Sequence, residues 1–433
     1  MNSIRRLERL LGFCLAWIIG ASIWAGSSLE DPTDHRLVAY EAGRGGPTSV
    51  VEQRRNSTNL SLHHSSTYLW TSNARIPDWM KEYMDWHTSV VSTLNVGNWQ
   101  QYRYLILRCY RKDERCGGVS DRLKPVPLVL LAAQRSKRIV FIDWDRPFAL
   151  TEFLVPPIGG FQWNAPSFLI PIFQETAGIY VLTRAANLID KSDNIQATLL
   201  ATHIHDTLGG ATQYDEEFGK GSFQQIYHDL FRILFQPSLA VQRLVNLHLI
   251  QNNRPQEGDI AAAAAVAAAS KGKLVEGEYT VAHYRAEYGR EVQRHPKLTE
   301  PSFLRQVAIN ALRCASDLKP GAPIYFASDN VEALQLARQL ASKTRYPIIT
   351  FERSEDTPLK LDAWNGTFVP SDFYSTFVDL YLAGSGACVS HGRGGFGRFA
   401  ALLSFNVSCS SKHVKQFFPV PCVGQPPFRA RPN

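Results

Sequence analysis

Three short polar clusters follow apolar, strand-like runs in the second half of the chain. They are His283 with Arg285 after YTVA, Ser328 with Asp329 after IYFA, and Ser390–Arg398 within VSHGRGGFGRFA. An arginine binds a diphosphate bidentately, a carboxylate accepts from ribose hydroxyls or base N–H groups, and a glycine loop that opens a helix can cradle phosphate oxygens. Together the clusters predict a site for a nucleoside diphosphate.

Each cluster alone has a plainer interpretation. Arg285 could form a surface ion pair, Asp329 could cap the next helix, and the glycines could have no role beyond forming a turn. Because the clusters recur at the ends of successive strands, we favour the binding site over these separate explanations.

The elements around these clusters alternate between strand and helix. Strand patterns occupy residues 274–285, 322–329 and 346–352, helical spacing occupies 303–318 and 331–344, and 373–405 reads as helix, strand, glycine loop and helix. This alternation predicts a parallel sheet, in which ligands bind at the carboxyl ends of the strands. The polar clusters fall at those ends.

The first half of the chain carries a similar unit. Residues 102–109 read as a strand, 116–122 (CGGVSDR) as a loop, 127–136 as a helix and 137–147 as a strand, after a helical lead-in at 67–94. Such a unit predicts two parallel strands with a right-handed crossover. Further on we expect short strands at 168–173 and 178–183 and a long helical segment at 223–251.

These motifs resemble those of the fucosyltransferase superfamily, which includes the nodulation, core, xyloglucan and protein O-fucosyltransferases. The resemblance runs from about Tyr102 to Phe405 and is carried by CGGVSDRLK with RIVFIDWDRP, then LFQPS, HYR, IYFASD and DLYLAGSGACVSHGRGGFGRFA. It implies an α/β chain of GT-B architecture, with two Rossmann-like domains facing a cleft. It also implies GDP-fucose as donor, inversion at the anomeric carbon and no metal cofactor.

Carried over by position, the resemblance makes Arg285 the catalytic arginine beside the diphosphate, and it places Asp329 at the guanine or ribose. The full set of implied substrate-binding residues is His283, Ser328, Asp329, Gly394, Gly395, Phe396, Gly397, Arg398, Gly117, Gly118, Asp121 and Arg122. At the last motif GGFG stands where many members have serine-rich sequence, so the identity of the donor sugar stays open. The alternatives are another nucleotide sugar and a non-catalytic, glycan-binding relative.

The reaction expected is direct displacement by an acceptor hydroxyl, with Arg285 stabilising the charge that develops on the departing diphosphate. A carboxylate of the first domain could act as general base, and Asp121, Asp143 and Asp145 are the candidates. Asp143 and Asp145 could equally cap the turn before Pro147. Segment 159–229 is expected to help form the acceptor pocket, for a glycan or a polypeptide hydroxyl.

Residues 10–29 contain no charged side chain and follow three arginines. This pattern predicts a membrane anchor with a cytoplasmic N-terminus, whereas Ala25 and Gly26 would suit a cleaved signal peptide. A tryptophan near each end of the segment favours the anchor. We expect a tail (1–9), anchor (10–29), stem (30–66), acceptor-side domain (67–258), alanine-rich linker (259–273) and nucleotide-sugar domain (274–433), in the Golgi or ER with the body luminal, or secreted after cleavage.

Sequons and cysteines agree with a secretory protein. Acceptor asparagines for glycosylation stand at Asn56, Asn59, Asn365 and Asn406, and six cysteines follow the apolar segment. The local pairings we expect are Cys109 with Cys116 and Cys409 with Cys422. His203 and His205 stand two apart on an expected strand, a spacing that is more often a polar edge than a metal site.

Overall composition is that of an ordinary globular protein, and the basic surplus fits an anionic small substrate better than a polyanion. The chain has 433 residues, 45% of them hydrophobic and 20% charged, with a net charge of +7. This composition excludes disordered, collagen-like and polytopic membrane proteins, and the absence of a basic run argues against nucleic acid as a partner.

Overall fold

A computed structural model describes residues 68–73, 75–111, 116–175, 180–184, 199–205, 215–218, 223–250, 273–286, 300–343, 347–352, 361, 366–392, 394–413 and 422–424. The expected tail, anchor and stem and nearly all of the linker lie outside them. All described residues belong to one compact unit, Ser65–Asn433. Among them, no helix is both long and apolar enough to cross a membrane.

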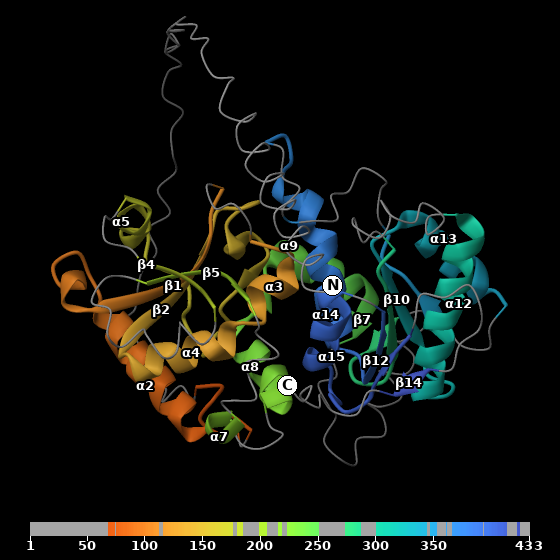
Figure 1. Cartoon of the computed structure of the whole chain (residues 1–433), viewed down its shortest axis with the longest axis horizontal. Helices are drawn as coiled ribbons and strands as arrows, with labels where there is room; N and C mark the ends of the chain where they lie inside the picture. The colour runs from red at the N-terminus through yellow and green to blue at the C-terminus, as the bar shows by residue number, and fades with distance from the viewer. Residues whose placement is uncertain are drawn as a thin grey trace, which may run out of the picture. The chain divides into compact units, whose positions relative to one another are not determined.

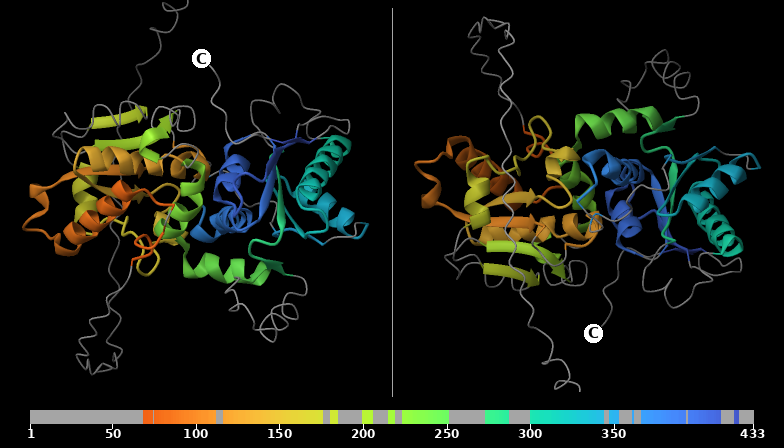
Figure 2. Two further views of the ribbon diagram at one scale, coloured as in Figure 1. Left: turned by 90° about the horizontal axis from the view of Figure 1, so that it is seen from below. Right: turned by 90° about the horizontal axis from the view of Figure 1, so that it is seen from above.

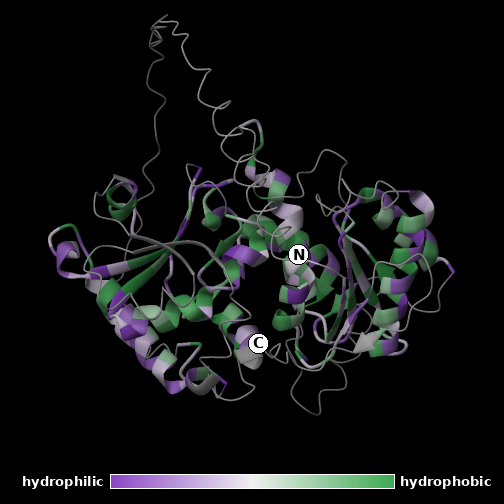
Figure 3. Cartoon of the chain, in the orientation of Figure 1, coloured by the Kyte–Doolittle hydropathy of each residue, from purple (hydrophilic) through white to green (hydrophobic). Residues whose placement is uncertain are grey.

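The first sheet has the strand order β2-β1-β5-β4 and is parallel throughout. Its strands are β1 (Arg103–Cys109), β2 (Arg138–Trp144), β4 (Tyr180–Arg184) and β5 (Leu199–His205). Helix α4 (Val126–Arg135) connects β1 to β2, and Figure 3 colours it hydrophobic along most of its length. The predicted strand, glycine loop, helix and strand are confirmed.

One expected strand is a helix. Residues 168–173 were expected to be extended, but α5 (Leu169–Glu175) is helical. Leu169 and Phe173, four positions apart, pack on Ile106 and Phe141 of the sheet, which is the spacing of one helix face. Pro171 is tolerated because its missing N–H falls in the first turn, where a helical N–H has no intrahelical partner.

The second sheet has the order β11-β10-β9-β12-β13-β14. Its strands are β9 (Thr280–Tyr284), β10 (Ile324–Ser328), β11 (Ile348–Ile349), β12 (Cys388–His391), β13 (Ser410–Lys412) and β14 (Val423–Gly424). Neighbours are parallel except β13 with β14. The described chain is therefore a mixed α/β structure built on parallel sheets.

Helices cover both faces of the second sheet (Figures 1 and 2). Ala282 and Phe326 pack with α12 (Pro301–Leu318) and α13 (Val331–Ala341). Val281 and Tyr325, one position earlier on their strands, belong to the cluster that contains α14 (Tyr374–Gly384) and α15 (Gly395–Leu403). This alternation explains why the strands read as continuous apolar runs.

The expected long helix at 223–251 is interrupted. Helix α8 (Phe223–Leu234) is followed by β6 (Gln236–Pro237) and then by α9 (Leu239–His248). Pro237 cannot continue a helix, and Ser238 caps α9 by accepting the N–H of Val241 at 3.4 Å. Helix α8 packs against α15, and α9 packs against α14.

The remaining elements are one helix of 16 residues and several short helices and strands. They are α2 (Asp78–Thr93), η1 (Trp99–Gln101), α3 (Val119–Leu123), η2 (Leu150–Glu152), β3 (Leu154–Val155), α7 (Asp215–Phe218), β7 (Leu249–Ile250), β8 (Leu274–Val275) and η6 (Pro370–Phe373). Of these, α2 is the expected helical lead-in, and α3 opens directly after the first glycine motif.

The disulfides correct one expected pairing. Cys109 pairs with Cys116 as expected, but Cys409 pairs with Cys388 and Cys422 with Cys314. The reason is tertiary: β12 and β13 are neighbours, and Val389 N–H donates to Cys409 O at 3.0 Å, so Cys388 and Cys409 lie side by side. Proximity along the chain could not reveal that ladder.

Candidate functional site

The centre of the second sheet is a topological switch point. From β9 the chain proceeds to β10 and β11 on one side, whereas β12 lies on the other side of β9. In open parallel sheets the crevice at such a point, outside the carboxyl ends of the strands, is the usual ligand site. His283, Arg285 and the glycine-rich turn that follows β12 all lie at these ends.

The turn Gly394–Gly395 is shaped by the side chain of Arg285. Gly394 has a φ of 114°, and a Cβ there would lie 2.9 Å from Arg285 Cδ and 3.1 Å from its Nη1. Glycine is therefore required for two reasons, the backbone conformation and the close approach of the guanidinium. Helix α15 begins at Gly395, so its first N–H groups, which have no acceptor within the helix, lie at this turn.

Arg285 is oriented by Asp329 at the end of the neighbouring strand. Arg285 Nε lies 3.8 Å from Asp329 Oδ2, and Asp329 Oδ1 accepts the N–H of Ala286 at 2.5 Å. In this structure the Asp329 carboxylate lies against the arginine, and the contact with the nucleoside expected for it stays a prediction. Asn330, and not Asp329, caps α13, since its side chain accepts the N–H of Ala333 at 2.9 Å.

Two other predicted residues are buried at the ends of β9 and β10, and one of them, His283, contacts the start of α15. The buried His283 ring stacks on Phe396 with centroids 5.1 Å apart, and a Cβ at Gly397 would lie 2.6 Å from His283 Nδ1. Ser328 is also buried, and its Oγ accepts the N–H of Asn330 at 3.2 Å. Arg398 lies on α15, and burial lowers its pKa.

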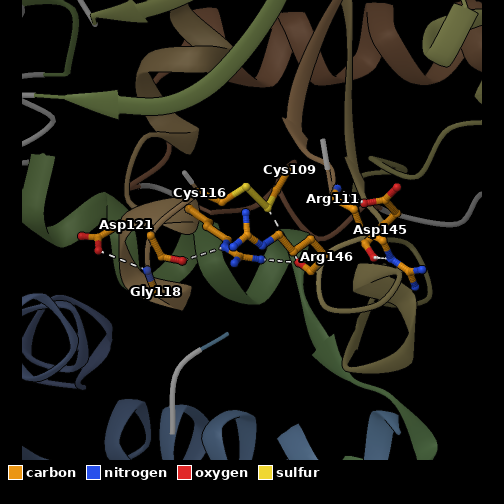
Figure 4. Close-up of a disulfide and its surroundings, with 9 residues drawn as sticks. Cys109, Arg111, Cys116, Gly118, Asp121, Asp145 and Arg146 are labelled. Atoms are coloured by element: carbon orange, nitrogen blue, oxygen red, sulfur yellow. Dashed lines mark hydrogen bonds between the residues drawn. A yellow bond between two sulfur atoms is a disulfide. The ribbon is translucent and has the colours of Figure 1, made fainter. Parts of the chain in front are cut away.

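The first glycine motif follows β1 and is tied to it by a disulfide (Figure 4). The Cys109–Cys116 bridge closes the loop, Gly117 has a φ of 75°, and Gly118 caps α3. The N–H of Gly118 donates to Asp121 Oδ2 at 3.3 Å. Asp121 is therefore held at the start of α3 by the backbone of its own motif.

Hydrogen bonds from the Arg122 side chain hold this loop in place. That side chain is buried, its Nε–H donates to Gly117 O at 2.9 Å, and its Nη1–H donates to Arg146 O at 2.5 Å. The guanidinium also lies 5.0 Å from the ring centroid of Trp144. These contacts hold the backbone of the motif, and the substrate contact expected for Arg122 stays a prediction.

The two glycine motifs meet. A Cβ at Gly395 would lie 2.7 Å from Ser120 Oγ, 3.2 Å from Asp121 Oδ1 and 3.4 Å from Lys124 Nζ. Helices α3 and α15 are accordingly in contact. Ser120 and Lys124 were not predicted as site residues, because no sequence rule says that α3 packs against a helix almost 280 residues further along the chain.

Asp143 and Asp145, the other candidate bases, occupy the end of β2. Tyr110 donates a hydrogen bond to Asp143, and burial is the main cause that raises the pKa of Asp143. Asp145 Oδ1 accepts the N–H of Arg111 at 2.6 Å, as a turn-capping carboxylate would (Figure 4). Asp121 is the candidate that lies beside Gly395.

A separate cavity of about 420 Å³ lies at the other end of the second sheet, before the first residues of β9 and β12. Its lining is Pro157, Phe231, Arg232, Phe235, Gln236, Pro237, Gln242, Val245, Asn246, Leu249, Glu276, Leu380, Tyr381, Gly384, Ser385 and Leu403. Glu276 accepts from Ser385 Oγ at 3.3 Å and from Arg232 at 3.4 Å. These partners lie within the cavity wall, away from the glycine turn.

The structure also bears on the paired histidines, on metal-binding clusters and on the glycosylation asparagines. β5 is a strand and ends at His205, so the two histidines are placed as expected along it. Across the described residues, no three His, Cys, Asp or Glu side chains gather in a way that could hold a metal ion. Asn406 is exposed, whereas Asn56, Asn59 and Asn365 lie outside the described residues.

Similarity to known proteins is found among solved structures. No protein-family model matches the chain, and no curated protein matches it. Among solved structures, it is similar to a mutant of Arabidopsis thaliana FUT1 in complex with GDP, with a TM-score of 0.45 and 13% sequence identity over 78% of each chain.

Proposed function

We propose that the chain is a glycosyltransferase that moves fucose from GDP-fucose to a hydroxyl of a glycan or protein, with inversion at the anomeric carbon. The observation that carries this proposal is the position of Arg285, pressed against the glycine turn that opens α15 at the switch point of the second sheet. A guanidinium beside the N–H groups of a helix start suits a diphosphate. The motif resemblance supplies the donor sugar.

In this mechanism the acceptor oxygen attacks the anomeric carbon while the bond from that carbon to the diphosphate oxygen breaks. The electron pair leaves with the diphosphate, and Arg285 stabilises the added negative charge. The proton of the acceptor hydroxyl passes to a base on the side of the first sheet, where Asp121, Asp143 and Asp145 are the available carboxylates.

The proposed enzyme needs no metal, because Arg285 and backbone N–H groups neutralise the diphosphate. We further propose a GT-B arrangement, with the two sheets forming Rossmann-like domains on either side of a cleft. The body is proposed to lie in the lumen of the Golgi or ER, held by residues 10–29 as a single-pass type II anchor, or to be secreted if that segment is cleaved.

Calorimetric titration of the full-length chain with GDP, GDP-fucose and UDP, each with a chelator present, tests the proposal. We expect binding of GDP and GDP-fucose but not of UDP, and loss of that binding in Arg285→Ala. Failure of the wild-type protein to bind either guanosine nucleotide would overturn it.

The GGFG sequence favours one alternative, transfer from another nucleotide sugar, because it departs from the serine-rich form of the motif. Binding of UDP in the same titration would select that alternative. Binding of free sugars without any nucleotide would select a non-catalytic glycan-binding protein.

A further inference from the structure

Lys124 is the cation that the first half of the chain brings to the glycine turn. It directly follows α3, its side chain is 11% exposed, and its Nζ lies 3.0 Å from Asp121 Oδ1. The same Nζ would be 3.4 Å from a Cβ at Gly395. A lysine this buried, at the meeting point of two helices, is unusual unless its charge is used.

The turn therefore has a cation on each side. Arg285, from the second sheet, lies against Gly394, and Lys124, from the first half, lies against Gly395. Each is paired with a carboxylate that is itself fixed by a backbone N–H, Asp329 by Ala286 and Asp121 by Gly118.

Lys124 has hydrogen-bonding capacity beyond its ion pair. An ammonium carries three donors, and among the described residues Asp121 is the hydrogen-bond partner of Lys124 Nζ. Two donors thus stay available to an anion at the turn. An anion there would contact charge from both halves of the chain at once.

The geometry points to Lys124 as a second residue that binds and stabilises the diphosphate, so that donor binding and the departure of the diphosphate depend on contact between α3 and α15. This inference rests on the proposed function, since it concerns the same diphosphate. Like Arg285, Lys124 would strengthen its interaction as negative charge develops on the departing group.

The experiment compares Lys124→Met with a matched control, Lys81→Met. Lys81 forms the same kind of pair three positions from an aspartate, with its Nζ 3.2 Å from Asp78 Oδ1 on α2. Titration of the full-length proteins with GDP and with guanosine measures the diphosphate and nucleoside parts separately. We expect Lys124→Met to weaken GDP binding by about 10- to 100-fold, as for a lost charged hydrogen bond, and to leave guanosine binding unchanged.

A double variant separates this role from simple neutralisation of Asp121. If Lys124 only neutralises Asp121, then Lys124→Met with Asp121→Asn should bind GDP as the wild type does. If Lys124 binds the diphosphate, the double variant should remain weak. Retained guanosine binding shows that the variants are folded.

The outcomes distinguish the two proposals. The wild type can bind GDP while binding falls no further in Lys124→Met than in Lys81→Met, or while the double variant binds GDP as the wild type does. Either result overturns the role of Lys124 and leaves the proposed function standing. Absence of GDP binding by the wild type overturns the proposed function and this inference together.

Discussion

Gly395 and Ser120 approach each other so closely that a Cβ on the glycine would lie 2.7 Å from the serine Oγ. The two residues lie in the first turns of helices that follow strands of different sheets, α15 after β12 and α3 after β1. This contact brings the two glycine motifs together, and it is the feature on which the first prediction depends.

Gly395→Ala is expected to reduce transferase activity strongly, because the new methyl group must push α3 away from α15. Adding Ser120→Ala removes the Oγ and leaves Asp121 Oδ1 at 3.2 Å as the next atom, so the double variant should recover part of the lost activity. The measurement is kcat/KM for the two single variants and the double variant.

Gly321→Ala is the control for glycine replacement itself. Gly321 has a φ of 82° and nothing within 4 Å of its missing Cβ, so its replacement costs backbone strain without a clash. Equal activity losses in Gly321→Ala and Gly395→Ala, or no recovery on adding Ser120→Ala, would contradict the predicted contact.

Arg285→Ala is expected to lower kcat by about 10²–10³-fold, the usual cost of losing one group that stabilises developing charge. The exposed Arg305→Ala on α12 is the matched control and should keep normal turnover. Initial rates at saturating donor and acceptor give the comparison. Near-normal turnover of Arg285→Ala would remove Arg285 from the mechanism.

Stability is expected to fall as pH drops from about 6.5 toward 4, and His87 is one cause. His87 is fully buried, its Nε2–H donates to Val140 O at 2.9 Å, and burial lowers its pKa from 6.5 to about 4. Between these values the unfolded state binds the proton and the folded state does not, so acid favours unfolding. A pKa shift of this size lowers the free energy of unfolding by about 3 kcal/mol once His87 is protonated in both states.

Denaturant unfolding between pH 7.5 and 4 tests this dependence. His228 contributes in the same direction, since burial and then Arg232 lower its pKa to about 4. His87→Gln keeps a donor for Val140 O but does not titrate, so its stability should decline less steeply with falling pH. A slope equal to that of the wild type would show that His87 is not responsible.

Removing the Cys314–Cys422 disulfide is expected to destabilise the fold more than removing Cys109–Cys116. The paired cysteines are separated by 108 and 7 residues, respectively. By restricting the entropy of the unfolded chain, the disulfide that closes the longer loop should stabilise the fold by about 5 kcal/mol. The one that closes the shorter loop should stabilise it by about 2–3 kcal/mol. Unfolding midpoints of the paired Cys→Ser variants measure the difference.

Peptide mapping without reduction tests the pairing itself. The expected linked peptides join Cys388 to Cys409 and Cys314 to Cys422. A peptide that joins Cys409 to Cys422 would restore the pairing expected from sequence proximity.

Local patterns in the sequence determined most of the secondary structure and one side of the candidate site. Apolar runs bounded by turn residues predicted β1, β2, β9, β10 and β12, and the polar residues after them identified Arg285 and the glycine turn. These features are local because a strand, its carboxyl end and the following turn are contiguous in the chain. The short α5 was misjudged because an apolar run of that length fits either a strand or a buried helix.

The tertiary structure alone decided which distant residues meet. The pairing of Cys388 with Cys409 depends on β13 lying next to β12, and the approach of Lys124 to Gly395 depends on α3 packing against α15. It also turned Arg122 inward and placed Asp329 against Arg285. Such contacts are set by the burial of apolar surface across the whole fold, which acts between residues far apart in the chain and leaves little trace in local sequence.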